Sequence, residues 1–176
     1  LCAAHHSKTV INKIATSSKN GTLDFYTHDI STGLSGSSKI NLNSSDSIFL
    51  NKLEGEKSEK IDYVKTINNS RKVPSKRMDS YMDENNITYI DFLKIDTQGH
   101  EPEVLSSFAD KLKNVHVVMT ELMFYDYYEK SLSFSDIEKI LHPAGFRLYD
   151  INHISKNPMN GRTDWVDVIY LNKDFM

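Results

Sequence analysis

The sequence of 176 residues has little cysteine and no long apolar run. Its one cysteine, Cys2, excludes an internal disulfide and fits a reducing compartment. No apolar run approaches the roughly 18 residues that span a bilayer, so we expect no membrane-spanning helix. Together these two absences predict a cytoplasmic protein that does not act at a membrane.

Several catalytic motifs are also missing. No serine lies in a G-x-S-x-G elbow, no phosphate-binding P-loop is present, and residues 33–36 do not complete G-x-G-x-x-G. The net charge of −3 gives no indication of nucleic acid binding. The first residues show neither a signal peptide nor an initiator methionine. We therefore expect the chain to begin inside a larger protein.

The second half of the chain carries the clearest structural pattern. Residues 90–95 are almost continuously apolar, which predicts a central parallel strand covered on both faces. Gly99 then marks a turn, and Pro102 lies near the first position of a helix predicted for residues 101–112. A second buried strand is predicted for residues 115–119. Strand-to-helix turns of this kind are where open α/β sheets place their ligands.

The remaining elements follow from local patterns. A helix begins after Ser135, with Glu138 completing a capping box. The other predicted elements are strands at residues 9–15, 22–27, 61–67, 146–151 and 165–171, a helix at 75–84, and loops at 29–47, 52–60 and 152–164. The order predicts a mostly parallel α/β sheet that ends in an antiparallel hairpin. The length predicts one domain over residues 1–176.

Two carboxylates dominate the candidate site. Asp96 ends the first central strand and Glu121 follows the second. If these strands are parallel neighbours, their carboxyl ends lie about 5 Å apart and open into one crevice. A carboxylate there could accept a hydroxyl proton or hold the cationic part of a cofactor. The alternative for Asp96, and equally for Glu101, is a cap on the following helix.

Other side chains near the turn are further candidates. His100 could be a general base or a hydrogen-bonded turn residue, and Lys94 could pair with a carboxylate in the crevice or extend from the sheet rim. Lys94, Glu101 and Tyr125 are the substrate-binding candidates, Tyr125 because it belongs to a Met- and Tyr-rich segment that could form a wall. A metal site from Asp96, His100 and Glu101 has no distinctive ligand spacing, so we predict none.

Residues 90–105 read Ile-Asp-Phe-Leu-Lys-Ile-Asp-Thr-Gln-Gly-His-Glu-Pro-Glu-Val-Leu. This segment resembles the central pattern of the FkbM-type methyltransferases, iDfLKIDvqGhE-evL. Residues 10–26, 73–81 and 120–122 are similar to three further blocks of that family. The resemblance implies a class I, Rossmann-like methyltransferase fold that uses S-adenosylmethionine to methylate a hydroxyl of a sugar or natural product.

The resemblance also implies site residues. It places Ile14, Ala15 and Thr16 near the adenine of the cofactor, and Asp96 near the methyl donor or acceptor. With Gln98, these residues are the cofactor-binding candidates, and Asp96, His100 and Glu121 are the catalytic ones. The resemblance implies a small-molecule partner that carries the accepting hydroxyl, and carbohydrates are candidates for it.

The chain departs from the family in one respect. The glycine-rich cofactor loop and the ribose-binding acid of the family lie upstream of the matching segments. We therefore expect an N-terminally truncated domain, completed by an upstream region, by another chain or by self-association. Two alternatives follow: a non-catalytic module of the same fold that needs a partner chain, and a carbohydrate- or nucleotide-sugar-binding domain.

Overall fold

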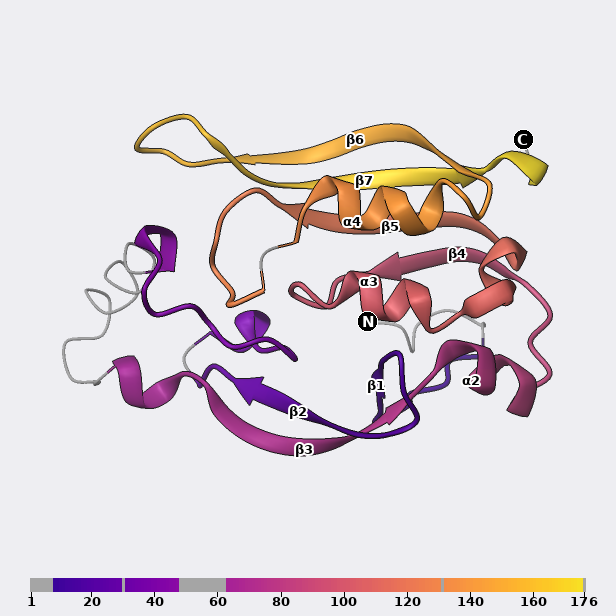
Figure 1. Cartoon of the computed structure of the whole chain (residues 1–176), viewed down its shortest axis with the longest axis horizontal. Helices are drawn as coiled ribbons and strands as arrows, with labels where there is room; N and C mark the ends of the chain where they lie inside the picture. The colour runs from indigo at the N-terminus through magenta and orange to yellow at the C-terminus, as the bar shows by residue number, and fades with distance from the viewer. Residues whose placement is uncertain (1–7, 30, 48–62, 131, 176) are drawn as a thin grey trace.

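The computed structural model describes residues 8–29, 31–47, 63–130 and 132–175. They form a mixed α/β structure with two sheets (Figure 1). The larger sheet has four strands in the order β4-β5-β7-β6. Its members are β4 (Ile90–Ile95), β5 (Val115–Met123), β7 (Thr163–Asn172) and β6 (Phe146–Lys156).

The prediction of a mostly parallel sheet is wrong for these residues. β4 and β5 pair in parallel, but β5 pairs with β7, and β7 with β6, in antiparallel fashion. The terminal hairpin is confirmed, and its return strand β7 lies between β5 and β6. The hairpin therefore contributes two of the four strands, which leaves one parallel pair to carry the predicted crevice.

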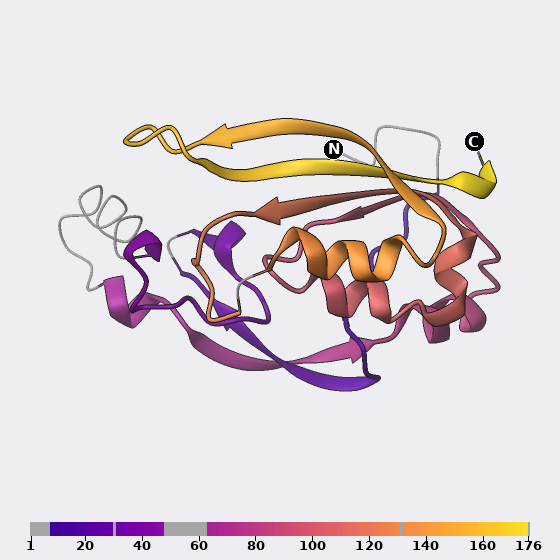
Figure 2. The same ribbon diagram turned by 45° about the horizontal axis from the view of Figure 1, so that its top comes forward.

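Three α-helices lie on one side of the four-stranded sheet (Figure 2). They are α2 (Met78–Glu84), α3 (Glu101–Ser106) and α4 (Phe134–Leu141). The core between helices and strands is apolar and closed, and includes Leu105, Phe108, Val118, Leu141 and Val168. Among the described residues, no helix has the length and apolar character needed to cross a membrane.

The helix predicted for residues 101–112 ends earlier than expected. α3 stops at Ser106, and a 3-10 helix follows over Ala109–Asn114. Ser107 explains the break because its hydroxyl donates to the carbonyl of Val104 at 2.6 Å and accepts from the backbone N–H of Met78 at 3.2 Å. A serine that serves two backbone partners competes with continuation of the helix.

β4 is an edge strand in the described part of the chain, and not the doubly covered strand that its apolar run predicted. Leu93 and Ile95 face the helices, whereas the Phe92 side chain on the opposite face is 54% exposed. No described strand pairs with the outer edge of β4. Within the described part of the chain, the outer edge of β4 therefore has no partner strand, and Phe92 beside it is exposed.

The smaller sheet comprises β1 (Ala15–Thr16), β3 (Asn69–Lys76) and β2 (Gly21–Thr27), in that order. The β2 prediction is confirmed, and the strand expected over residues 9–15 is confined to β1. The sequence did not indicate β3, because its polar residues and Pro74 lack an apolar alternation. Short 3-10 helices occur at Thr32–Leu34, Tyr63–Thr66 and Lys173–Phe175.

Two further predictions need correction. The strand expected over residues 61–67 is a 3-10 helix in its described part, while residues 52–60 lie outside the described residues. Most of the loop expected over residues 152–164 belongs to the long β6–β7 hairpin. Most side chains of β6 are exposed, so apolar and polar residues do not alternate along it as they do in a half-buried strand. The sequence pattern therefore did not predict the length of β6.

The observed N-cap of α4 lies two residues before the predicted cap, Ser135. Ser133 is the N-cap, and its backbone N–H and hydroxyl both donate to Asp136 Oδ2, at 3.0 and 2.7 Å. This contact holds the pKa of the Asp136 carboxyl below its ordinary value. The capping box is therefore Ser133–Asp136, and not the predicted Ser135–Glu138.

The cap makes a stability prediction. We expect Ser133→Ala to lower the free energy of unfolding by about 1 kcal/mol, because helix N–H groups lose their acceptor. Ser135→Ala is the matched control, since among the described residues the Ser135 hydroxyl is hydrogen-bonded to the Ser133 hydroxyl, at 2.8 Å, and to no helix N–H group. Urea unfolding of both variants measures the difference, and an equal or larger loss for Ser135→Ala would contradict the observed cap.

Candidate functional site

The turn between β4 and α3 is held in an uncommon backbone conformation. Gln98 and Gly99 have φ values of 56° and 91°, in the left-handed region that favours glycine. The Gln98 side chain is held at both ends: its Nε2 donates to Asp96 Oδ1 at 3.0 Å, and its Oε1 accepts from the Tyr128 hydroxyl at 2.8 Å. A non-glycine residue in this conformation is retained where surrounding contacts fix it.

Asp96 is oriented by two partners. Lys94 Nζ donates to Asp96 Oδ2 at 3.0 Å, and Gln98 occupies the other carboxylate oxygen. The contact with Asp96 raises the pKa of the Lys94 ammonium. The Asp96 side chain is still 43% exposed, so its carboxylate is fixed in direction and open to a ligand.

Glu121 lies beside Asp96, as the parallel-strand argument predicted. Ile95 of β4 pairs with Thr120 of β5, so the next residue on each strand is a carboxylate. On the other side of β5, Glu121 is paired with Asp167 of β7. Burial, followed by the charges of Asp96, Glu101 and Asp167, raises the pKa of Glu121 from 4.5 to about 7, against the opposing effect of Lys94.

Glu101 is buried, with 1% of its surface exposed. Its Oε1 accepts from the Thr97 backbone N–H at 2.8 Å and from the Thr97 hydroxyl at 3.0 Å, while its Oε2 has no hydrogen-bond partner among the described residues. Burial raises its pKa. These contacts favour the capping and turn-holding alternative over direct substrate binding, which stays a prediction.

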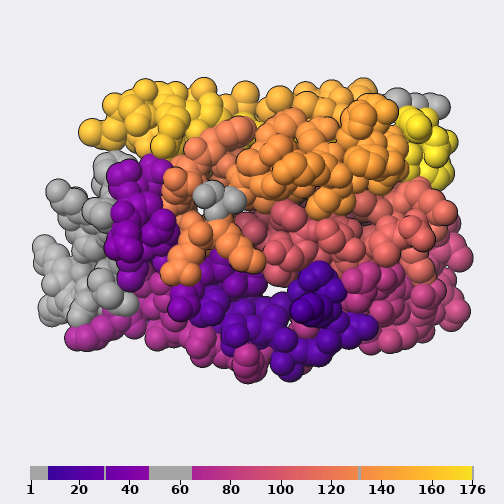
Figure 3. All heavy atoms as spheres, viewed as in Figure 1, coloured from indigo at the N-terminus to yellow at the C-terminus, as the bar shows by residue number. Residues whose placement is uncertain are grey.

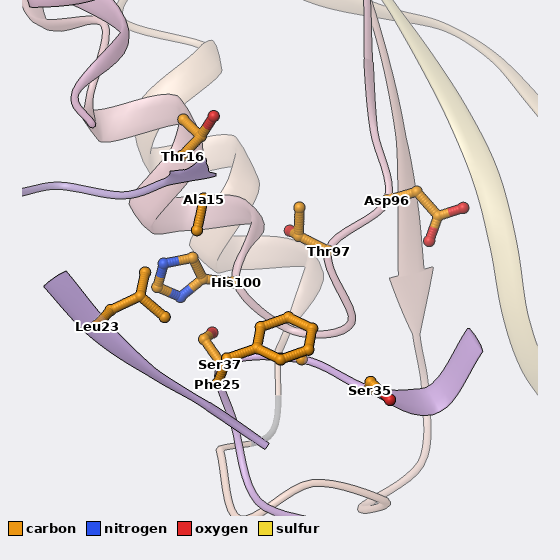
Figure 4. Close-up of a pocket in the computed structure, with 10 residues that line it drawn as sticks. Ala15, Thr16, Leu23, Phe25, Ser35, Ser37, Asp96, Thr97 and His100 are labelled. Carbon is orange, nitrogen blue, oxygen red and sulfur yellow. The ribbon is translucent and has the colours of Figure 1, made fainter. Parts of the chain in front are cut away.

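A cavity of about 240 Å³ lies on the other side of the turn (Figure 4). It is lined by Ala15, Thr16, Leu23, Phe25, Ser35, Gly36, Ser37, Asp96, Thr97 and His100. Figure 3 shows a hollow where the indigo and purple residues of the smaller sheet meet the rose-coloured residues around α3. Ligand pockets usually measure about 300–1,000 Å³, so this cavity has room for part of a ligand.

His100 faces this cavity. Its Nε2 lies 3.3 Å from Ser17 Oγ, and its Nδ1 lies 3.6 Å from Glu103 Oε2. Burial lowers the pKa of His100. Figure 4 shows the Asp96 carboxylate pointing away from His100, although Asp96 also lines the cavity. The single crevice expected from the sequence is therefore two groups of side chains, one on each side of the turn.

The family comparison agrees with the central motif. The model of the methyltransferase FkbM domain matches residues 2–148. The chain belongs to the FkbM methyltransferase domain family. No curated protein and no solved structure matches the chain. The resemblance found in the sequence is thus confirmed, and the chain is assigned to a methyltransferase family by most of its length.

Two predicted site residues of this FkbM domain lie apart from the turn. Ile14 is 39% exposed and lines a neighbouring cavity together with Ala15. Tyr125 lines a separate cavity of about 350 Å³ with Phe124 and Phe134, and burial raises the pKa of its hydroxyl. The charge of Glu121 also contributes to this shift.

Thr97, Tyr128 and Asp167 also contribute to the candidate site, and the sequence did not single them out individually. Thr97 binds Glu101, Tyr128 binds Gln98, and Asp167 faces Glu121. Asp167 carried a readable signal, since it is an acid in the middle of an alternating apolar strand. The contacts of Tyr128 depend on the fold and had no such signal. In the described residues, no three His, Cys, Asp or Glu side chains are grouped to hold a metal ion.

The raised pKa of Glu121 predicts a pH-dependent stability. Between 4.5 and about 7, folded Glu121 keeps a proton that the unfolded chain releases, so its contribution to stability falls as pH rises through this window. Between about pH 5 and about pH 8, we expect the free energy of unfolding of Glu121→Gln to rise relative to that of the native chain by on the order of 1 kcal/mol. Urea unfolding at the two pH values measures the gain.

The matched control is Glu129→Gln, which changes an exposed glutamate that is not among the charges named as shifting the pKa of Glu121. This variant should track the native chain at both pH values. A difference between Glu121→Gln and the native chain that is the same at both pH values would show that Glu121 does not titrate in this window.

Proposed function

We propose that this chain forms the acceptor side of an S-adenosylmethionine-dependent O-methyltransferase that acts on a hydroxyl of a sugar or natural-product-like molecule. The observation that carries the proposal is the pair of carboxylates at the neighbouring ends of β4 and β5. Asp96 is exposed and held by Lys94 and Gln98, and Glu121 has a pKa of about 7. Membership of the FkbM family supports methyl transfer as the reaction.

The carboxylate group fits the charge of the proposed cofactor. S-adenosylmethionine carries a positive sulfonium and an ammonium group, and Asp96, Glu121 and Asp167 raise the local negative charge with one nearby cation, Lys94. Gln98 adds a polar side chain beside Asp96. The family resemblance assigns the adenine to Ile14, Ala15 and Thr16, and the last two line the cavity that contains His100.

When bound, S-adenosylmethionine would supply an electrophilic methyl group. The acceptor oxygen would bond to the methyl carbon, the sulfur would keep both electrons of the broken carbon–sulfur bond, and the acceptor proton would pass to a base of the chain. Asp96 orients the hydroxyl by accepting its hydrogen bond. Glu121 is the better proton acceptor, because a base is most effective with a pKa near the working pH. Positioning of the two reactants contributes most of the rate.

His100 is a third catalytic candidate with a different place. Its ring lies in the cavity beside Ala15 and Leu23, whereas the Asp96 carboxylate points away from it (Figure 4). The lowered pKa keeps the imidazole neutral, so it could accept a proton from a ligand in that cavity. We rank it below Glu121, because Glu103 and Ser17 already contact its two nitrogens.

A second candidate function is a non-catalytic module that is completed by another segment or chain. The outer edge of β4, which is unpaired among the described residues, favours it, because an unpaired edge can receive a further strand, and the exposed Phe92 lies beside that edge. The two functions differ in what the chain binds. A folded chain that binds no S-adenosylhomocysteine would favour the module.

The proposal predicts a preference for the charged cofactor. Because the carboxylates attract a sulfonium, we expect the chain to bind S-adenosylmethionine more tightly than S-adenosylhomocysteine, which lacks the sulfonium charge. Asp96→Asn should reduce this preference by about fivefold to tenfold. Isothermal titration calorimetry with both ligands measures it.

Asp110→Asn is the control, because Asp110 is an exposed carboxylate outside the turn. It should leave the preference unchanged. If Asp96→Asn leaves the preference of the native chain intact, Asp96 does not recognise the cofactor charge and the assignment fails.

A further inference from the structure

A second cavity of about 440 Å³ adjoins the one beside His100. It is lined by Asn12, Lys13, Ile14, Ala15, Phe25, Arg71, Val73 and Pro74. Ala15 and Phe25 also line the first cavity, so the two share a wall. The volume lies within the range of about 300–1,000 Å³ that is usual for small-molecule sites.

The register of the smaller sheet places the side chains of this second cavity. Phe25 of β2 is opposite Arg71 of β3, and Leu23 is opposite Val73. Residues two apart on a strand share one face, so Phe25, Arg71 and Val73 lie together. The Arg71 guanidinium lies 5.4 Å from the centre of the Phe25 ring. An apolar floor and a cation are therefore combined at one place.

The charge of the second cavity is unbalanced. Lys13 and Arg71 line it, and no acidic residue does. Neither cation has an ion pair with a described residue, whereas Lys72, the neighbour of Arg71 on the opposite face of β3, pairs with Asp24 at 2.8 Å. An apolar cavity with two uncompensated cations complements an anionic ligand.

We propose that the second cavity binds a small molecule through an anionic group, with Lys13 and Arg71 holding the anion and with Phe25 and Val73 contacting an apolar or sugar ring. Two sources share this chemistry: a phosphate on the methyl acceptor and the carboxylate of S-adenosylmethionine. Two cations fit a phosphate monoester, which carries a charge close to −2 at neutral pH. The cofactor carboxylate is part of a zwitterion and needs less compensation. The phosphate is therefore the favoured source.

This inference deepens the proposed function by naming the class of acceptor. The role of the ligand as methyl acceptor rests on the proposed function, whereas the anion site itself does not. The ligand would bind on the far side of Phe25 from His100, within reach of the shared wall. A phosphorylated sugar would then be anchored next to the cavity that contains His100.

The test measures the binding of glucose 1-phosphate to the chain of residues 1–176 by NMR chemical-shift titration. Methyl glucoside is the uncharged counterpart and inorganic phosphate the ringless one. We expect glucose 1-phosphate to bind more tightly than either, and Arg71→Ala and Lys13→Ala each to weaken it by about tenfold. Lys72→Ala is the matched control, because it removes the same charge from the opposite face of β3 and should have no effect.

The outcomes separate the two proposals. Glucose 1-phosphate that does not bind, or that binds equally to the native chain and to Arg71→Ala, overturns the phosphate site. If Arg71→Ala weakens the binding of S-adenosylhomocysteine but not that of glucose 1-phosphate, the cavity is assigned to the cofactor carboxylate and the acceptor assignment is overturned. If the sugar phosphate behaves as expected while S-adenosylhomocysteine does not bind, the anion site stands and only methyl transfer by this chain fails. Should Arg71→Ala fold poorly, Arg71→Gln gives the same comparison.

Discussion

The hydrogen bonds between Glu101 and Thr97 fix the geometry on which the candidate site depends. They connect the first residue of α3 to the residue after Asp96, and they close a turn whose centre has two left-handed residues in succession. Burying a carboxyl group is costly, and here Oε2 is left without a hydrogen-bond partner among the described residues. The compensation is a rigid turn. Without it, Asp96 and His100 would have no fixed relation to the strand or to the helix.

The rigid turn separates two environments of different charge. On the side of the open sheet face, Asp96, Glu121 and Asp167 are crowded, and the repulsion is released by keeping Glu121 partly protonated near neutral pH. On the other side, His100 is buried beside the smaller sheet and its pKa is lowered, which keeps the ring uncharged. Both shifts have burial as their first cause. The site thus holds a proton acceptor on each side of the turn without a cluster of formal charges on the His100 side.

The parts of the site that the sequence predicted are those set by adjacent residues. The apolar run before Asp96, Gly99 and Pro102 placed the strand, the turn and the start of α3 from local chemistry alone. The parallel pairing of β4 with β5 then placed Glu121 beside Asp96. The course of β3, the Tyr128 contact with Gln98 and the edge position of β4 depend on partners distant in sequence. Local patterns do not encode those partners, and the same apolar run suits both a central strand and an edge strand.

The smaller sheet contributes positive charge next to the candidate site, whereas the turn and β5 contribute carboxylates. The pairing of Phe25 with Arg71 is a matter of strand register, and a slip by one residue would move Arg71 to the face where Lys72 now pairs with Asp24. Register therefore decides that Arg71, and not Lys72, lies beside Phe25 in the second cavity. Under the proposed function, the cations of the second cavity and the carboxylates beyond the turn would orient two ligands of opposite charge. A cationic methyl donor would be drawn toward Asp96, and an anionic acceptor toward Arg71. Electrostatic complementarity of this kind selects orientation before the reacting atoms come into contact.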